Sequence, residues 1–406
     1  GGTILASFPM VSKRGRLAVT DNPGWTIQQS DPIVDELKQQ LAAARKELNG
    51  IPRTTVPTMR ERDTDFQRQT HLFVRGNWLE TGELIEKPGT PGVFPTLESE
   101  GERPTRHDLA RWIASPENPP TARVPVNRFG LEMFGTGIAP TPEDLGSAGE
   151  KPSHPALLDH LAVRFATDMK WSIKSLLREI ATSATYRQDA AVTPELLERD
   201  RFNRFLARGP RQRLTAEMAR DTPLAVAGLL THQVGGPPVH PPIPTGVWKP
   251  FSADKWNTPA EGEADRYRRA LYTYWKRSIP YPSMITFDAP SREMCSKRRL
   301  VSNTPLQALT ILNDPAFHEC AKGLARRMKN EATGDLDGRL AFGYRLATSR
   351  EPTTDRIEEL RSLFHDLEQR YAAEPNTMKG LAGTPDGAAY TVVASVLLNL
   401  DEAIAR

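Results

Sequence analysis

The chain has 406 residues, of which 38% are hydrophobic and 25% are charged, a composition typical of a globular protein. Its 53 cations and 50 anions give a net charge of +3, which is too balanced for a nucleic-acid-binding protein with a basic patch. The length suffices for two or three domains, and two cysteines exclude a disulfide-rich scaffold. No apolar run of eighteen residues occurs, so we expect no transmembrane segment.

The first 30 residues mix β-type residues with Gly, Pro and Asn, and the run GWTIQQS predicts a strand before a turn. We interpret residues 1–30 as the tail of a β-rich module whose beginning is absent. The first residue is not Met, and no basic region followed by an apolar stretch marks a signal peptide. We therefore expect a fragment or a processed product.

Residues 31–104 are predicted to form one helix and an extended arm. The helix runs to residue 49 and places Val34, Leu37, Leu41 and Leu48 on one face. The segments TTVPTMRE and THLFVRGNWLE alternate apolar and polar residues, which indicates strands or strand-like arms. A long Pro/Gly loop follows them.

From residue 105 the pattern becomes helical. Thr105 is expected to cap a helix to residue 114, with Asp108 at the reciprocal position of a capping box. Ser153 is expected to cap the next strong amphipathic helix. Further helices are predicted over residues 121–135, 171–185, 214–230, 264–278, 337–350, 353–372 and 390–399. The fold class is therefore mainly α: a multi-helix domain over residues 105–406, with a short β-containing N-terminal arm and long Pro-rich loops.

The run FDAPSREMCSKRRLVSNTPLQALTILND, residues 287–314, is the most unusual stretch. Cations three and four residues from Cys295 would favour its thiolate, the setting of a reactive cysteine. Alternatively, Arg292, Arg298 and Arg299 pair with Asp288 and Glu293 and hold a structural turn. If a pocket exists, we expect Asp288, Arg292 and Arg298 at or near its wall.

Cys295 and Cys320 either form one disulfide or remain as thiols, and the sequence leaves both open. No Cys-x-x-Cys occurs, so the chain has no site for covalent haem attachment and no zinc ribbon. The histidines never occur as H-x₃-H, so a zinc site on one helix is not expected. His154, at a helix start, is a candidate base or ligand, and its alternative is a cap arrangement.

Aromatic residues suggest a carbohydrate platform. Trp248 and Trp256 lie in the Pro/Gly-rich loop 231–262, whose length is typical of a functional or wrapping segment. Tyr272 and Tyr274 follow among cations, a mixture that can stack on sugars or bases. The alternatives are a lid over the helical core for the loop, and core packing at helical spacing for the tyrosines.

Several long segments resemble the domain of unknown function 1553 family, and they occur in that family's order over roughly residues 50–406. These segments are ARWIASPENPPTARVPVNRFGLEMFGTGI, PSHPALLDHLAVRF, SATYRQD, FLARGPRQRLTAEMARD, YRRALYTYWKRSIPYPSMITFDAPSREMCSKRRLVSNTPLQALTILNDPAF and VASVLLNLDEAI. The resemblance implies the C-terminal part of a large secreted or envelope protein of planctomycete-type bacteria. Such proteins usually carry a domain of unknown function 1549 upstream. Often they also carry a cytochrome c domain and a lectin-like β-sandwich, whose last strand residues 1–30 resemble.

The resemblance implies a periplasmic, cell-envelope or secreted location and no particular reaction. The leading expectation is a subunit or C-terminal part of a cytochrome c-associated complex. Haem c would then lie in a partner chain or an upstream domain, with no cofactor in this chain. One alternative is a carbohydrate-active or carbohydrate-binding module for polysaccharide, and another is a non-catalytic scaffold. Other protein chains or the upstream domains are the expected partners.

Overall fold

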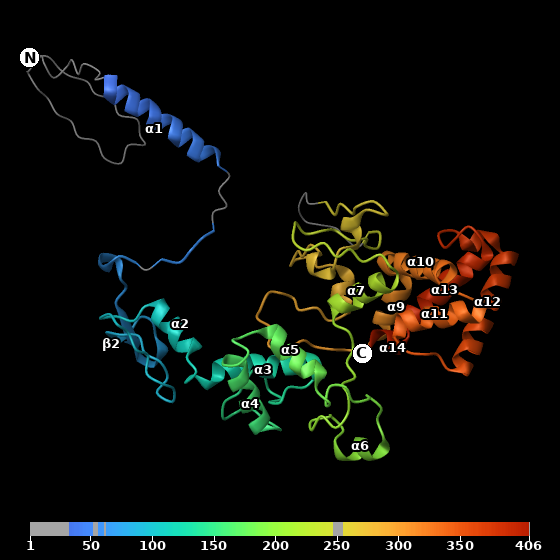
Figure 1. Cartoon of the computed structure of the whole chain (residues 1–406), viewed down its shortest axis with the longest axis horizontal. Coiled ribbons are helices and arrows are strands. Elements are labelled where there is room, and N and C mark those ends of the chain that lie inside the picture. Colours follow the sequence, from blue (N-terminus) through green and yellow to red (C-terminus); the bar gives the residue numbers. More distant parts are fainter. Residues whose placement is uncertain (1–31, 52–55, 61, 247–254, 406) are drawn as a thin grey trace, which may run out of the picture. The chain divides into compact units, whose positions relative to one another are not determined.

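A computed structural model describes residues 32–51, 56–60, 62–246 and 255–405 (Figure 1). The chain divides into two compact units, Gly1–Glu86 and Lys87–Arg406. The described residues form fourteen α-helices, several 3₁₀ turns and one two-stranded sheet, which confirms the mainly α fold with a short β arm. The strand predicted at residues 25–29 lies outside the described residues.

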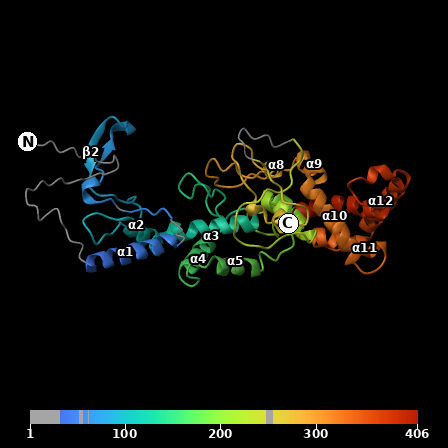
Figure 2. The same ribbon diagram turned by 90° about the horizontal axis from the view of Figure 1, so that it is seen from above.

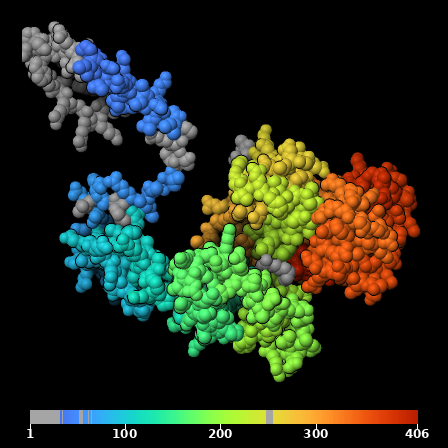
Figure 3. Space-filling model, in the orientation of Figure 1, coloured from blue at the N-terminus to red at the C-terminus, as the bar shows by residue number. Residues whose placement is uncertain are grey.

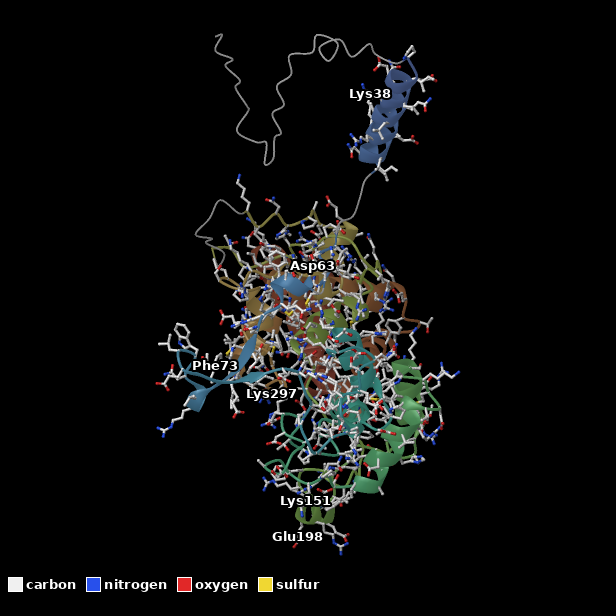
Figure 4. The ribbon with its side chains drawn as sticks, turned by 90° about the vertical axis from the view of Figure 1, so that its left-hand side faces the viewer. Lys38, Asp63, Phe73, Lys151, Glu198 and Lys297 are labelled. Carbon is white, nitrogen blue, oxygen red and sulfur yellow. The ribbon has the colours of Figure 1, made fainter. Side chains whose placement is uncertain are left out.

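The first unit contains one helix and one hairpin. Helix α1 spans Pro32–Gly50, as expected, and its Leu37 and Leu41 side chains are exposed. Strands β1 (Thr70–Phe73) and β2 (Thr81–Ile85) pair antiparallel, with Thr70 opposite Ile85. Figure 4 labels Lys38 on the helix and Phe73 in the hairpin, and the side chains around each project from the backbone. For TTVPTMRE we predict a strand or a strand-like arm, and residues 56–60 of it are irregular and form no strand.

The second unit begins with short helices around a small core. The bounds of α2 to α6 are Arg106–Ala114, Pro119–Phe134, Pro155–Ala166, Ile173–Thr182 and Pro194–Arg199. The capping box of Thr105 and Asp108 is confirmed, since each bonds the other's backbone N–H. The buried side chains of this core come from α3, α4, α5 and the loop after α3: Val126, Ile138, Leu158, Phe165, Leu176 and Ile180.

The predicted cap of α4 is wrong. His154, rather than Ser153, occupies the N-cap position, and its side chain makes no capping hydrogen bond. The Ser153 hydroxyl instead donates to the Ile138 carbonyl at 3.2 Å, which ties the loop after α3 to the start of α4. A serine one residue before the cap cannot reach the first free N–H groups of the helix.

The larger core lies in the C-terminal half. Its helices α7 to α14 span Ala216–Val226, Pro282–Thr286, Pro305–Asn313, Pro315–Asn330, Leu336–Thr348, Thr354–Ala373, Pro385–Leu398 and Asp401–Ile404. Helix α13 packs against α10 and α12, and α11 contacts α10, α12 and α13 (Figure 2). The orange and red atoms of these helices form a continuous mass in Figure 3. Leu324, Met328, Leu340 and Leu397 are completely buried there.

The segment 264–278 is not a helix, contrary to the prediction. It forms two 3₁₀ turns, Ala264–Tyr267 and Ala270–Tyr272, and Leu271 is exposed. Its backbone bonds the preceding loop instead of itself: Val239 N–H donates to the Tyr272 carbonyl and Tyr274 N–H donates to the Val239 carbonyl, both at 2.8 Å. These contacts between segments replace the bonds within the segment that a helix needs.

Candidate functional site

The run that stands out in the sequence contains a hydrogen-bonded turn centred on Asp288, which has a left-handed backbone (φ +61°). Its carboxylate accepts from the Ser302 N–H at 2.8 Å and from the Ser302 hydroxyl at 2.7 Å. The buried Gln307 amide donates to the Thr286 carbonyl at 3.1 Å and accepts from Arg213 at 2.9 Å. We call residues 288–302 the polar turn. This network closes the turn onto the start of α9.

The cations of the polar turn contact groups outside it. Arg299 bonds Glu217 at the start of α7, Arg298 lies 4.0 Å from Glu143, and the Arg292 guanidinium lies 4.3 Å from the centre of the Trp275 ring. Burial favours a higher pKa for Glu217, but the hydrogen bond from Arg299, a backbone hydrogen bond and the charges of Arg299 and Arg292 together outweigh it and lower that pKa.

The expected pairing of these cations with Asp288 and Glu293 is therefore wrong. Asp288 is occupied by Ser302, and the cations reach across to neighbouring segments. They fasten the turn to other parts of the second unit. Lys297, at the centre of the turn, is labelled in Figure 4.

The two cysteines are free thiols and do not form a disulfide. Cys295 is exposed in the polar turn, whereas Cys320 lies in the larger core, as expected for a small buried residue. Burial raises the pKa of Cys320 to about 12, so it stays protonated at neutral pH. His154 contacts Ser153 and the ring of Phe205, which belong to other segments than the polar turn.

A cavity beside Asp288 is too small for a substrate. Its volume is about 10 Å³, room for one water molecule. Asp288 lines it, together with Ser302, Gln307 and Arg299, whereas Arg292 and Arg298 do not. The polar turn is thus a closed network with an outer surface, without a reaction chamber at Asp288.

The aromatic candidates lie in an internal cluster. Trp256 stacks on Tyr281 with ring centres 5.8 Å apart, and its N–H donates to the Pro241 carbonyl at 2.7 Å. Tyr274 packs against His240, whose pKa is lowered by burial. The Trp256 ring therefore holds the loop 231–246 against Tyr281.

Of the other two aromatic candidates, Tyr272 and Trp248, only Tyr272 lies within the described residues. Tyr272 lies under the guanidinium of Arg268, and its hydroxyl accepts from the Gly235 N–H at 2.8 Å, which again serves the loop. Trp248 lies outside the described residues. The carbohydrate platform that we predict from these four aromatic residues stays a prediction.

A buried polar cluster went unnoticed in the sequence. The carboxylate of Asp314 caps α10 by accepting from the Ala316 N–H at 2.9 Å, and only 4% of this residue is exposed. Burial raises its pKa to about 6, although that hydrogen bond and the charge of Arg220 oppose the rise. Burial and the charge of Asp314 also raise the pKa of Tyr281. The only sequence signal for this cluster was the Asp-Pro pair at a helix start.

We expect Asp314→Asn to stabilise the protein at pH 8. Because the folded-state pKa of Asp314 is raised, the folded state binds the extra proton between about pH 4 and pH 6, and stability falls as pH rises through that window. A shift from 3.8 to about 6 corresponds to about 3 kcal/mol lost above pH 6. Asparagine keeps the cap without the charge.

Urea unfolding at pH 4 and pH 8 measures this effect. The gain from Asp314→Asn should be larger at pH 8. Asp337→Asn is the control, because the hydrogen bond from Arg361 lowers the pKa of Asp337. This variant should lose stability where Asp314→Asn gains it, and the loss should be larger at pH 8. If the gain from Asp314→Asn were equal at the two pH values, Asp314 would not titrate as inferred.

Large apolar side chains lie on the outer face of the same stretch. Helix α9 buries Gln307 and Ile311, while Leu306, Leu309 and Leu312 are 60%, 54% and 43% exposed. Spaced three residues apart, these leucines share one face of the helix. We define the apolar patch as these three leucines together with Met294, Leu300 and Val301, which are exposed in the polar turn that precedes α9 in the chain. Exposed apolar surface of this kind is typical of interaction sites.

The sequence alone does not single out this patch, because the spacing of the leucines defines a face of α9 without showing whether that face is buried. The sequence does contain a signal for this exposed face. Gln307 lies among leucines and shares a face of the helix with Ile311, four residues on. Among the described residues, no group of three or more His, Cys, Asp or Glu side chains could hold a metal ion. No helix in the part of the chain that the structure describes is long and apolar enough to cross a bilayer.

Comparison with known proteins places most of the chain in one family. The family model described as "Protein of unknown function (DUF1553)" matches residues 105–364. The match includes the polar turn, the buried cluster and the apolar patch. No curated protein and no solved structure matches the chain.

Proposed function

We propose, because the chain belongs to the family described as Protein of unknown function (DUF1553), that its helical domain is a docking subunit of a larger protein assembly. The observation that carries the proposal is the outer face of α9: Leu306, Leu309 and Leu312 face outward, while Gln307 and Ile311 are buried. The buried Gln307 amide is hydrogen-bonded within the fold, so the packing of the chain itself accounts for it. The three outward leucines are exposed apolar surface of the kind found at interaction sites.

The apolar patch is large enough in energy to bind a partner. Fully burying a Leu, Val or Met side chain contributes about 1.5–3 kcal/mol, and these six residues are 43–82% exposed, so burying their remaining surface gives about 6–11 kcal/mol. Association costs about 4–15 kcal/mol in lost freedom. The three leucines of α9 alone would not suffice, whereas the whole patch can.

The chemistry of the partner follows from the charges around the patch. Exposed cations of the polar turn, Arg292, Lys297 and Arg298, lie in the same stretch as Met294 and Leu300. An apolar face bordered by cations suits a partner with an apolar face bordered by carboxylates. The partner is therefore expected to bind more weakly as ionic strength rises.

The wider context of the proposal rests on the family resemblance. We place the assembly in the cell envelope, with a haem c-bearing protein as its partner and complex organic matter or polysaccharide as its substrate. The resemblance to proteins that join cytochrome c domains to this domain supports the context. In this proposal the chain supplies a surface, and the redox chemistry belongs to the partner.

The test is co-purification from the native source with tagged full-length chain, followed by titration of the purified partner. Leu306→Asp/Leu309→Asp should lower the affinity by at least a hundredfold, because two charges would enter an apolar contact. The control is Leu271→Asp, a leucine that is 66% exposed outside the patch. A haem stain of the bound chain tests the identity of the partner separately.

Two results would contradict the proposal. One is a partner retained equally by the double variant and by the Leu271→Asp control. The other is a monodisperse native preparation with no bound protein. Circular dichroism of both variants must match that of the wild type, so that lost binding does not reflect lost folding.

A further inference from the structure

A cleft of about 270 Å³ lies between α3 and α4, and no residue of the polar turn or the apolar patch lines it. Its walls include the small side chains Ala122, Ala162 and Ala166, which leave space between the two helices. Trp171, which is 38% exposed, also lines the cleft. A volume just below 300 Å³ is at the lower end for a small-molecule site and suits a single ring.

Trp171 is held in place by its surroundings. Its ring meets Phe165 edge to face with centres 5.3 Å apart, and its backbone N–H donates to the Phe165 carbonyl at 2.9 Å. The backbone of both Lys170 and Trp171 is left-handed, with φ of +49° and +61°. Consecutive left-handed residues without glycine are costly, so this fixed ring is a specific feature of the fold.

Polar groups from both helices also line the cleft. The Arg123 side chain bonds the Asp159 carboxylate, with its Nε 2.7 Å and its Nη2 2.6 Å from Oδ1. Asn118 is 94% buried at the start of α3. Its side-chain amide donates to the Trp112 carbonyl at 3.3 Å and does not cap the helix.

The charged residues of the cleft indicate which class of ligand it can bind. Because Arg123 and Asp159 neutralise each other, the cleft offers no net charge to a phosphate or to an ammonium group. An aromatic ring beside paired donors and acceptors suits a ring with an apolar C–H face and hydroxyl groups on its edge. We propose that this cleft binds a neutral sugar ring, stacked on Trp171 and hydrogen-bonded to Asp159, Arg123 and Asn118. This inference is independent of the docking function.

Saturation-transfer NMR of the full chain with neutral monosaccharides tests the proposal. Glucose, galactose, mannose and N-acetylglucosamine serve as probes, and adenosine serves as a planar competitor. At least one sugar should bind saturably in the millimolar range. Trp171→Ala should weaken binding at least tenfold, while Trp78→Ala, at an exposed tryptophan of the first unit, should leave it unchanged.

A second variant tests the cleft independently, in case Trp171→Ala does not fold. Ala166→Phe fills the cleft without removing any polar group, and it should abolish sugar binding while the melting temperature stays close to that of the wild type. The docking variant Leu306→Asp/Leu309→Asp should bind sugar normally. Three results would overturn the inference: no saturable sugar, tighter binding of adenosine than of any sugar, or full binding by Ala166→Phe.

Discussion

Arg268→Leu is expected to destabilise the protein by about 3–5 kcal/mol, because it removes a buried cation that is hydrogen-bonded to two backbone carbonyls. Arg268 is only 1% exposed, although it is a cation. Its guanidinium donates to the Pro237 carbonyl at 3.0 Å and to the Gly235 carbonyl, and lies 3.9 Å from the centre of the Tyr272 ring. Leucine fills only part of the space of the arginine side chain and leaves both carbonyls without their donor.

The loop 231–246 should respond more than the helices. Because Arg268 fastens this loop, its amides should exchange faster with solvent in Arg268→Leu, while amides of α10 and α13 keep their relative protection. Chemical denaturation gives the free energy of unfolding, and hydrogen exchange locates the change. Arg277→Leu is the matched control, since Arg277 is exposed in the same segment. Equal losses from the two variants would contradict the anchoring role.

Arg220→Leu should cost about 3–5 kcal/mol at pH 8 and less at pH 5. Arg220 is 5% exposed and donates to the backbone carbonyls of Arg268, at 2.7 Å, and Arg266, at 3.3 Å. It also lowers the pKa of Asp314 against the effect of burial. Without this cation the pKa of Asp314 rises further above its unfolded value, so more stability is lost as pH increases.

The pH dependence separates this prediction from a simple packing defect. Unfolding at pH 5 and pH 8 should give unequal losses for Arg220→Leu, and Arg220→Leu/Asp314→Asn should recover part of the loss at pH 8. Arg326→Leu on the exposed side of α10 is the control. A pH-independent loss that Asp314→Asn does not relieve would remove the electrostatic link between these residues.

Most helices were predictable from the sequence, because local signals agreed with the final packing. The capping box at Thr105 is a local motif, and it forms as expected. Helix α5 was predictable from its apolar spacing, and Leu176 and Ile180 are buried. The segment 264–278 has helical spacing too, but its backbone bonds a loop about 30 residues upstream. A contact of that range leaves no periodic signal in the segment itself.

The site was less predictable, because its residues interact across the fold. Arg299 was correctly expected in an ion pair, but its partner Glu217 lies 82 residues away. Nothing local distinguishes Glu217 from the nearer Glu293. The spacing of the α9 leucines reveals a face of the helix and leaves open what that face meets. The cleft at Trp171 requires two helices and a turn, so no single stretch could indicate it.

The free thiols make the protein easy to label at one position. The chain contains two cysteines, and Cys320 is buried and protonated at neutral pH, whereas Cys295 is exposed in the polar turn. A maleimide dye at neutral pH should therefore attach once per molecule, one residue from Met294 of the apolar patch. The wild-type sequence thus provides a fluorescent reporter at the proposed interface without any engineered cysteine.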